Sequence, residues 1–156
     1  MTIISPCLWF DDNLEEAAKF YTGIFPNSSV GHLARLPDGG VMAGDFDLNG
    51  LTFRGINGGP THATFTEAVS FSITCADQSE VDYYWDSLVD GGQESMCGWL
   101  KDKFGLSWQV VPQRLYDLLS DTDPIRARAS AQALLQMQKI VVADLEAAAD
   151  TAGHPA

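Results

Sequence analysis

The chain has 156 residues, 46% hydrophobic and 19% charged, which is typical of one folded domain with a real core. Its formal net charge of −12 argues against nucleic acid or an anionic membrane surface as a partner, because like charges repel. No bilayer-spanning apolar stretch or signal peptide is evident, and three widely spaced cysteines argue against a disulfide scaffold, so we expect a cytoplasmic protein.

The first third of the chain predicts a βαβββ unit. A short apolar strand runs from Ile3 to Phe10, and Asn13 with Glu16 forms a capping-box pattern at the start of a helix. The dipeptide Asn49-Gly50 is a strong hairpin signal. Three strands are therefore expected after the helix, at residues 28–36, 41–48 and 51–56.

The middle of the chain predicts the same order of elements again. Residues 68–75 alternate apolar and polar side chains, as a strand does, and Asp77 with Glu80 forms a second capping-box pattern. Two short strands are expected within residues 93–100. A turn at residues 102–105, in which Asp102 is a turn former, leads into the last strand.

The two halves match in sequence as well as in order. Residues 50–54 (GLTFR) correspond to residues 105–109 (GLSWQ) position by position, which indicates an internal duplication. We therefore predict an α+β fold with two βαβββ modules, at about 3–57 and 68–112, that pack into one domain over residues 1–156. A helical C-terminal extension is expected at about 113–149, with one helix starting at Pro124.

Four stretches resemble the vicinal-oxygen-chelate superfamily, which has the glyoxalase/bleomycin-resistance/dioxygenase fold. They are PCLWFDDNLEEAAKFYTGIFPNS, NGGP, CGWLKDKFGLSWQVVP and DPIRARASAQALLQMQKI. Together they resemble the PhnB-like branch, labelled "3-demethylubiquinone-9 3-methyltransferase domain", over roughly residues 3–148. The resemblance implies two βαβββ modules that form a cupped mixed sheet, in a protein that is usually a homodimer.

Metal enzymes of this superfamily take four ligands, usually His, Glu or Gln, from the first and last strands of each module. The matching positions in this sequence are Pro6, Arg54, Ser70 and Gln109. None of these side chains is an imidazole or a carboxylate, which divalent ions prefer. We therefore expect no superfamily-type metal site and no cofactor.

Strand parity sorts the side chains into two faces. We expect the helices to cover a normal core that includes Cys7, Trp9, Phe53 and Trp108. The opposite face, mixed in polarity, is either an ordinary solvated sheet face or a pocket for a small molecule. The candidate ligand-binding residues on that face are Arg54, Gln109, Ser70, Ser72, Phe10 and Thr52.

Arg54 carries most of this prediction. A guanidinium on a cupped face should meet an anionic or carbonyl group of a ligand, or else form a salt bridge with one of the many acidic neighbours. The favoured function is a metal-independent small-molecule-binding protein with its ligand in the cup. The alternative is an enzyme of unknown reaction on a small organic substrate, although the chain lacks the glycine-rich strand-loop-helix pattern usual for methyltransferases that use S-adenosylmethionine.

Overall fold

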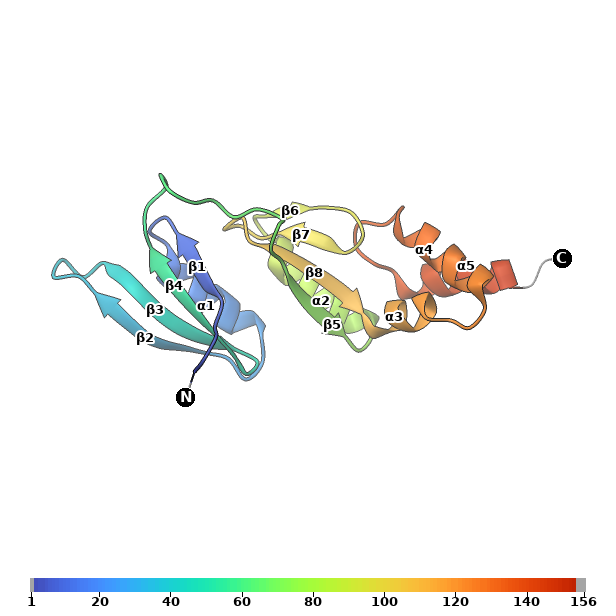
Figure 1. The fold of residues 1–156 in the computed structure, drawn as a ribbon, viewed down its shortest axis with the longest axis horizontal. Helices are drawn as coiled ribbons and strands as arrows, with labels where there is room; N and C mark the ends of the chain where they lie inside the picture. The colour runs from blue at the N-terminus through green and yellow to red at the C-terminus, as the bar shows by residue number, and fades with distance from the viewer. Residues whose placement is uncertain (1, 154–156) are drawn as a thin grey trace. The chain divides into compact units, whose positions relative to one another are not determined.

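The computed structural model describes residues 2–153, and the chain divides into two compact units, of which one ends at Phe65 and the other begins at Thr66 (Figure 1). Each unit contains one four-stranded mixed sheet with a helix on one face, so the α+β class and the duplicated βαβββ order are confirmed. The packing of both modules into one domain stays a prediction. Among the described residues, no helix combines the length and apolar character needed to cross a bilayer.

The first unit has the strand order β1-β4-β3-β2, with β1 parallel to β4 and the other pairs antiparallel. Its core lies between α1 and the sheet, where Tyr21 stacks on Phe46 and Phe46 stacks on Phe53. The elements are β1 (Cys7–Phe10), α1 (Leu14–Ile24), β2 (Ser29–Arg35), β3 (Val41–Leu48) and β4 (Leu51–Asn57).

The start of α1 is capped by a residue distant in sequence. Asn13 occupies the N-cap position but makes no capping hydrogen bond with its side chain. The Leu14 N–H instead donates to Asn57 Oδ1 at 3.0 Å, and the Asn57 amide donates to the Val41 carbonyl at 2.9 Å. The expected Asn13–Glu16 capping box is therefore wrong, because the end of β4 supplies the acceptor.

The second unit repeats the topology in the order β5-β8-β7-β6, with β5 parallel to β8. Here the expected cap is confirmed: the Glu80 N–H donates to Asp77 Oδ1 at 3.0 Å, and Glu80 Oε2 accepts from the Ala76 N–H at 2.7 Å. The elements are β5 (Phe71–Cys75), α2 (Gln78–Val89), β6 (Gln93–Glu94), β7 (Trp99–Lys101) and β8 (Ser107–Pro112).

Asp102 organises the turn between β7 and β8. Its side chain is buried, and Oδ1 accepts hydrogen bonds from the Phe104 and Leu106 N–H groups at 2.9 and 3.1 Å. Oδ2 accepts from Trp108 Nε1 at 2.8 Å. The predicted turn former is thus also a core residue, and its carboxylate has three donors that offset the cost of burying a charge.

Three further helices follow β8: α3 (Gln113–Leu119), α4 (Pro124–Leu134) and α5 (Val142–Gly153). Their apolar side chains form a cluster with the end of β8, centred on Val111, Leu115, Leu118, Ile140 and Leu145. The segment after α4 also pairs with the connection between β6 and β7, since the Cys97 and Gly98 N–H groups donate to the Met137 and Gln138 carbonyls. The predicted extension is therefore an integral part of the second unit.

Candidate functional site

Each sheet has one face that its helix covers and one open face. In the first sheet the covered face includes Phe53 and Gly55, because a Cβ on Gly55 would lie 2.2 Å from the Leu14 side chain of α1. Thr52 and Arg54 alternate with these residues and lie on the open face, as predicted. The structure therefore brings these two candidate residues together.

The predicted parity of β1 is wrong. Cys7 is aligned with Arg54 and Leu8 with Gly55, so Cys7 and Trp9 lie on the open face. Leu8 and Phe10 are buried on the covered face, and Phe10 is only 2% exposed. The face assigned to Phe10 is corrected accordingly, and its predicted contact with a ligand loses its geometric basis.

A difference in loop length explains this error. Between the last buried strand residue and the N-cap there are two residues in the first module, Asp11 and Asp12, but only Ala76 in the second. An alignment anchored on the helix starts therefore slips by one residue in β1, and a slip of one residue moves every side chain to the other face. The sequence carries a signal of this slip, because FDDN (residues 10–13) has one aspartate more than the corresponding CAD (residues 75–77).

Arg54 is exposed, and its guanidinium has no hydrogen bond or ion pair with any of residues 2–153. Its partner across the sheet is Asp45, but Asp45 Oδ1 instead accepts the His32 N–H at 2.8 Å. The alternative considered for Arg54, a salt bridge to an acidic neighbour, is thus absent from the described part of the chain. The Thr52 hydroxyl, by contrast, is engaged, because it donates to Asp47 Oδ1.

Trp9 is a residue of the open face that the sequence analysis missed. Its Nε1 donates to the Gly59 carbonyl at 2.9 Å, and its ring contacts His62 edge-on with a centroid separation of 6.1 Å. A Cβ on Gly58 would lie 2.1 Å from the indole ring, so the NGGP loop requires glycine there in order to approach it. The loop therefore packs on Trp9.

The open face of the second sheet is arranged as predicted. Ser72 is aligned with Gln109, and Gln109 Nε2 donates to Ser70 Oγ at 2.9 Å, so the three candidates of this module lie together. Trp99 pairs with Gln109 and Lys101 pairs with Ser107 across β7 and β8, which places both side chains on the same face. Sequence reasoning did not include either in the site.

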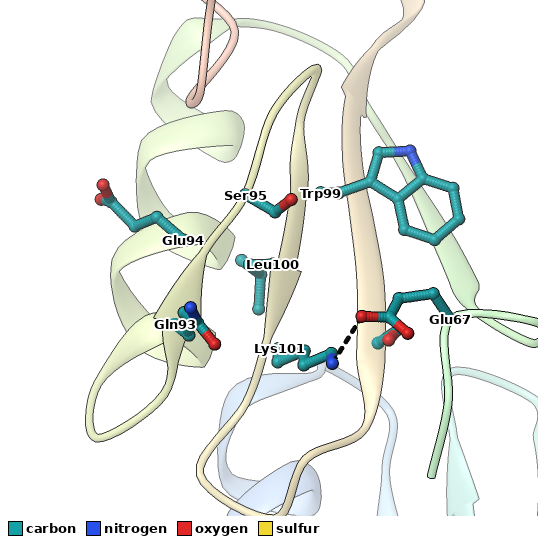
Figure 2. Close-up of a pocket in the computed structure, with 8 residues that line it drawn as sticks. Glu67, Gln93, Glu94, Ser95, Trp99, Leu100 and Lys101 are labelled. Carbon is teal, nitrogen blue, oxygen red and sulfur yellow. Dashed lines mark ion pairs between the residues drawn. The ribbon is translucent and has the colours of Figure 1, made fainter.

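A cavity of about 110 Å³ opens on this face, near β6 and β7 (Figure 2). The side chains of Glu67 and Lys101 form an ion pair at its edge, and this hydrogen bond holds the pKa of Glu67 below its usual value. Glu94 points away from that pair in Figure 2, and its Oε1 accepts the Trp85 Nε1–H at 3.1 Å. The remaining polar lining comes from Gln93, Ser95 and Ser107.

The described residues offer little conventional catalytic chemistry. Residues 2–153 contain no group of three or more His, Cys, Asp or Glu side chains that could hold a metal ion. All three cysteines are free. Burial raises the pKa of the Cys75 thiol to about 12, which makes that thiol a poor nucleophile at neutral pH.

Comparison with known proteins identifies a matching family. The model of the 3-demethylubiquinone-9 3-methyltransferase family matches residues 2–111. The PhnB protein from Bacillus cereus is 33% identical, with a TM-score of 0.66 over 71% of this chain and 99% of that chain. A comparison with curated proteins finds no match.

Two further solved structures share the fold at lower identity. Protein PA1353 from Pseudomonas aeruginosa is 18% identical, with a TM-score of 0.60 over 72% of this chain and 98% of that chain. The fosfomycin resistance protein FosX from Listeria monocytogenes, solved with Mn(II) and sulfate, is 17% identical, with a TM-score of 0.51 over 70% of this chain and 91% of that one. The fold is thus that of the vicinal-oxygen-chelate superfamily.

Proposed function

The chain belongs to the 3-demethylubiquinone-9 3-methyltransferase family of the glyoxalase/bleomycin-resistance fold, and from this premise we propose that it is a metal-independent small-molecule-binding protein. The ligand is held on the open sheet faces, in the cup expected from the resemblance. The contacts proposed for it are Arg54, Thr52, Ser70, Ser72 and Gln109. Free cysteines fit a reducing cytoplasm, and the resemblance favours a homodimer.

The observation that carries this proposal is the guanidinium of Arg54, which makes no hydrogen bond or ion pair within residues 2–153. It lies on the open face beside Thr52, while the chain has 21 acidic residues available as partners. An arginine can bind a carboxylate, phosphate or carbonyl group with two parallel hydrogen bonds. A ligand with such a group is the partner that the geometry favours.

Metal independence rests on the donor set. Of the four positions matched to the superfamily's metal ligands, Pro6 came from the alignment that slips in β1, where Cys7 lies on the open face opposite Arg54. No group of three or more His, Cys, Asp or Glu side chains in residues 2–153 could join Cys7 around a metal ion. The other three positions hold Arg54, Ser70 and Gln109, and Gln109 already donates to Ser70. A cationic guanidinium repels a metal cation, and neutral hydroxyl and amide groups bind divalent ions weakly without a carboxylate or imidazole. FosX, which was solved with Mn(II), therefore supports the fold of this chain but not its metal content.

The family description favours a second candidate, an enzyme acting on a small organic substrate such as a quinone. The structure offers it limited support. The Gly55–Pro60 segment leads from β4 into a loop, and no helix follows before β5. Gly55 packs against Leu14, Gly58 packs against the Trp9 ring, and the Gly59 carbonyl accepts from Trp9 Nε1, so these glycines serve packing contacts within the unit rather than a nucleotide.

The test is a thermal-shift screen of the full chain with quinones, thiol conjugates, S-adenosylmethionine and divalent metals. We expect an organic ligand to raise the melting temperature, and Arg54→Ala to reduce its affinity at least tenfold. Stabilisation by zinc, nickel or manganese would overturn metal independence. Stabilisation by S-adenosylmethionine would favour the enzyme, and a ligand that binds Arg54→Ala equally well is not held by Arg54.

A further inference from the structure

Ser107 is a buried hydroxyl without a partner. Its side chain is 1% exposed, and Oγ makes no hydrogen bond within residues 2–153. Leaving a buried polar group unpaired costs free energy, so such groups are uncommon and point to a ligand or a water. Ser107 is among the residues that line the 110 Å³ cavity, so a ligand bound there would lie next to this side chain.

Lys101 lies directly opposite Ser107 across the antiparallel pair of β7 and β8. Side chains in this arrangement have Cβ atoms about 5 Å apart and can contact one small molecule together. The ammonium group of Lys101 already holds a carboxylate, that of Glu67. The cavity therefore has a cation that binds carboxylate and, beside it, an unused hydroxyl.

Glu67 is suited to being displaced. It lies in the loop before β5, and its side chain is 62% exposed, compared with 35% for Lys101. An ion pair this exposed contributes little to stability, so an incoming carboxylate can replace Glu67 at small cost.

From these observations we propose that the cavity is a carboxylate subsite. The Glu67 carboxylate stays paired with the Lys101 ammonium group until the carboxylate of a small ligand displaces it. An oxygen on the carbon next to that carboxylate bonds to Ser107 Oγ, which makes 2-hydroxy or 2-oxo carboxylates the fitting class. This inference rests on the proposed function, because Trp99 of the cavity pairs with Gln109 on the same face.

The experiment is an NMR titration of the isotopically labelled full chain with sodium glycolate, at ionic strength held constant with sodium chloride. Acetate lacks the second oxygen, and glycolamide lacks the charge. We expect glycolate to shift the amide signals of Glu67, Lys101 and Ser107 saturably, with acetate several-fold weaker and glycolamide at least tenfold weaker. Equal responses to glycolate and glycolamide, or no saturable response, would overturn the subsite.

Three variants assign the roles. Lys101→Met removes the cation and should abolish binding, whereas Lys103→Met, the matched control on the neighbouring turn, should leave it unchanged. Glu67→Gln should tighten glycolate binding several-fold, because the internal competitor loses its charge. Ser107→Ala should lower the affinity for glycolate to that for acetate. A Glu67→Gln protein with unchanged or weaker affinity would contradict the displacement.

The outcomes separate this inference from the proposed function. If a ligand of the thermal-shift screen depends on Arg54 while glycolate gives no saturable response, the subsite is wrong and the proposed function stands. If glycolate binds through Lys101 while no ligand depends on Arg54, the subsite stands and the larger site is wrong. Folding of Lys101→Met is checked from its dispersed amide spectrum, and Glu67→Gln changes only an exposed side chain.

Discussion

The two modules have the same order of elements but solve the same local problems with different residues. In the first, the N-terminus of the helix is capped by Asn57 from β4; in the second, it is capped by Asp77 in the adjacent loop. On the first open face Arg54 has no partner among the described residues, whereas on the second Gln109 donates to Ser70. A duplicated topology therefore does not duplicate its chemistry, and each module has to be interpreted from its own contacts.

The two aspartates Asp47 and Asp102 hold matching positions in the aligned modules. Their alanine substitutions should show the largest difference in the loss of unfolding free energy. Asp102→Ala leaves two backbone N–H groups and the Trp108 Nε1–H without their acceptor in a buried turn. We expect it to lower the free energy of unfolding by about 3 kcal/mol. The measurement is chemical denaturation followed by tryptophan fluorescence.

The control for this prediction is Asp47→Ala. Asp47 is half-buried and accepts from the exposed Thr52 hydroxyl, which water can satisfy after the substitution. We expect a loss of about 1 kcal/mol or less. Equal losses at both aspartates would show that the turn in the second module is not anchored by Asp102.

The next largest difference in stability is expected between substitutions of two residues that lie at the start of α1, Asn57 and Asn13. Asn57→Ala removes the acceptor of the Leu14 N–H and a donor to the Val41 carbonyl, which should cost about 1–2 kcal/mol. Asn13→Ala is the matched control and should cost less than about 0.5 kcal/mol, because its side chain makes no capping bond. Denaturation midpoints measure both, and a larger effect at Asn13 would contradict the long-range cap.

Acid should weaken only one of the two caps. Hydrogen bonds from the Ser79 hydroxyl and the Glu80 N–H lower the pKa of Asp77 below its ordinary value, so its contribution is present above the unfolded pKa and is lost as pH falls through the folded pKa. We expect the protection factors for amide exchange in the first turn of α2 to fall below about pH 4. In Asp77→Asn this response should be lost, and α1 should not show it because its Asn57 cap does not titrate.

The smallest effect on stability is expected at the proposed ligand contact. Arg54 is exposed and has no side-chain partner within residues 2–153, so Arg54→Ala should change the free energy of unfolding by less than about 0.5 kcal/mol. Arg126→Ala is a useful contrast, because Arg126 pairs with Asp121 and Asp150. A large loss of stability in Arg54→Ala would indicate a structural role and weaken the proposed function.

Much of the fold follows from local patterns. Alternation along residues 68–75 predicted the strand Phe71–Cys75 and its faces, and Asp77 with Glu80 predicted the start of α2. These predictions succeed because the determining atoms lie within a few residues of one another. The Asn13 prediction fails because a residue 43 positions away supplies the acceptor.

Local signals along the chain were enough to predict the duplicated βαβββ modules, the turn at Asp102 and the family; these signals are the apolar period, the turn chemistry and the repeated GLTFR and GLSWQ segments. The side of the sheet on which Phe10 and Trp9 lie depends on long-range packing, because one extra loop residue reverses the parity of β1. The same packing leaves Arg54 without a partner among residues 2–153, engages Gln109 with Ser70 and places Ser107 opposite Lys101 beside a cavity. Such pairings depend on strand register, which long-range packing sets and no short segment encodes.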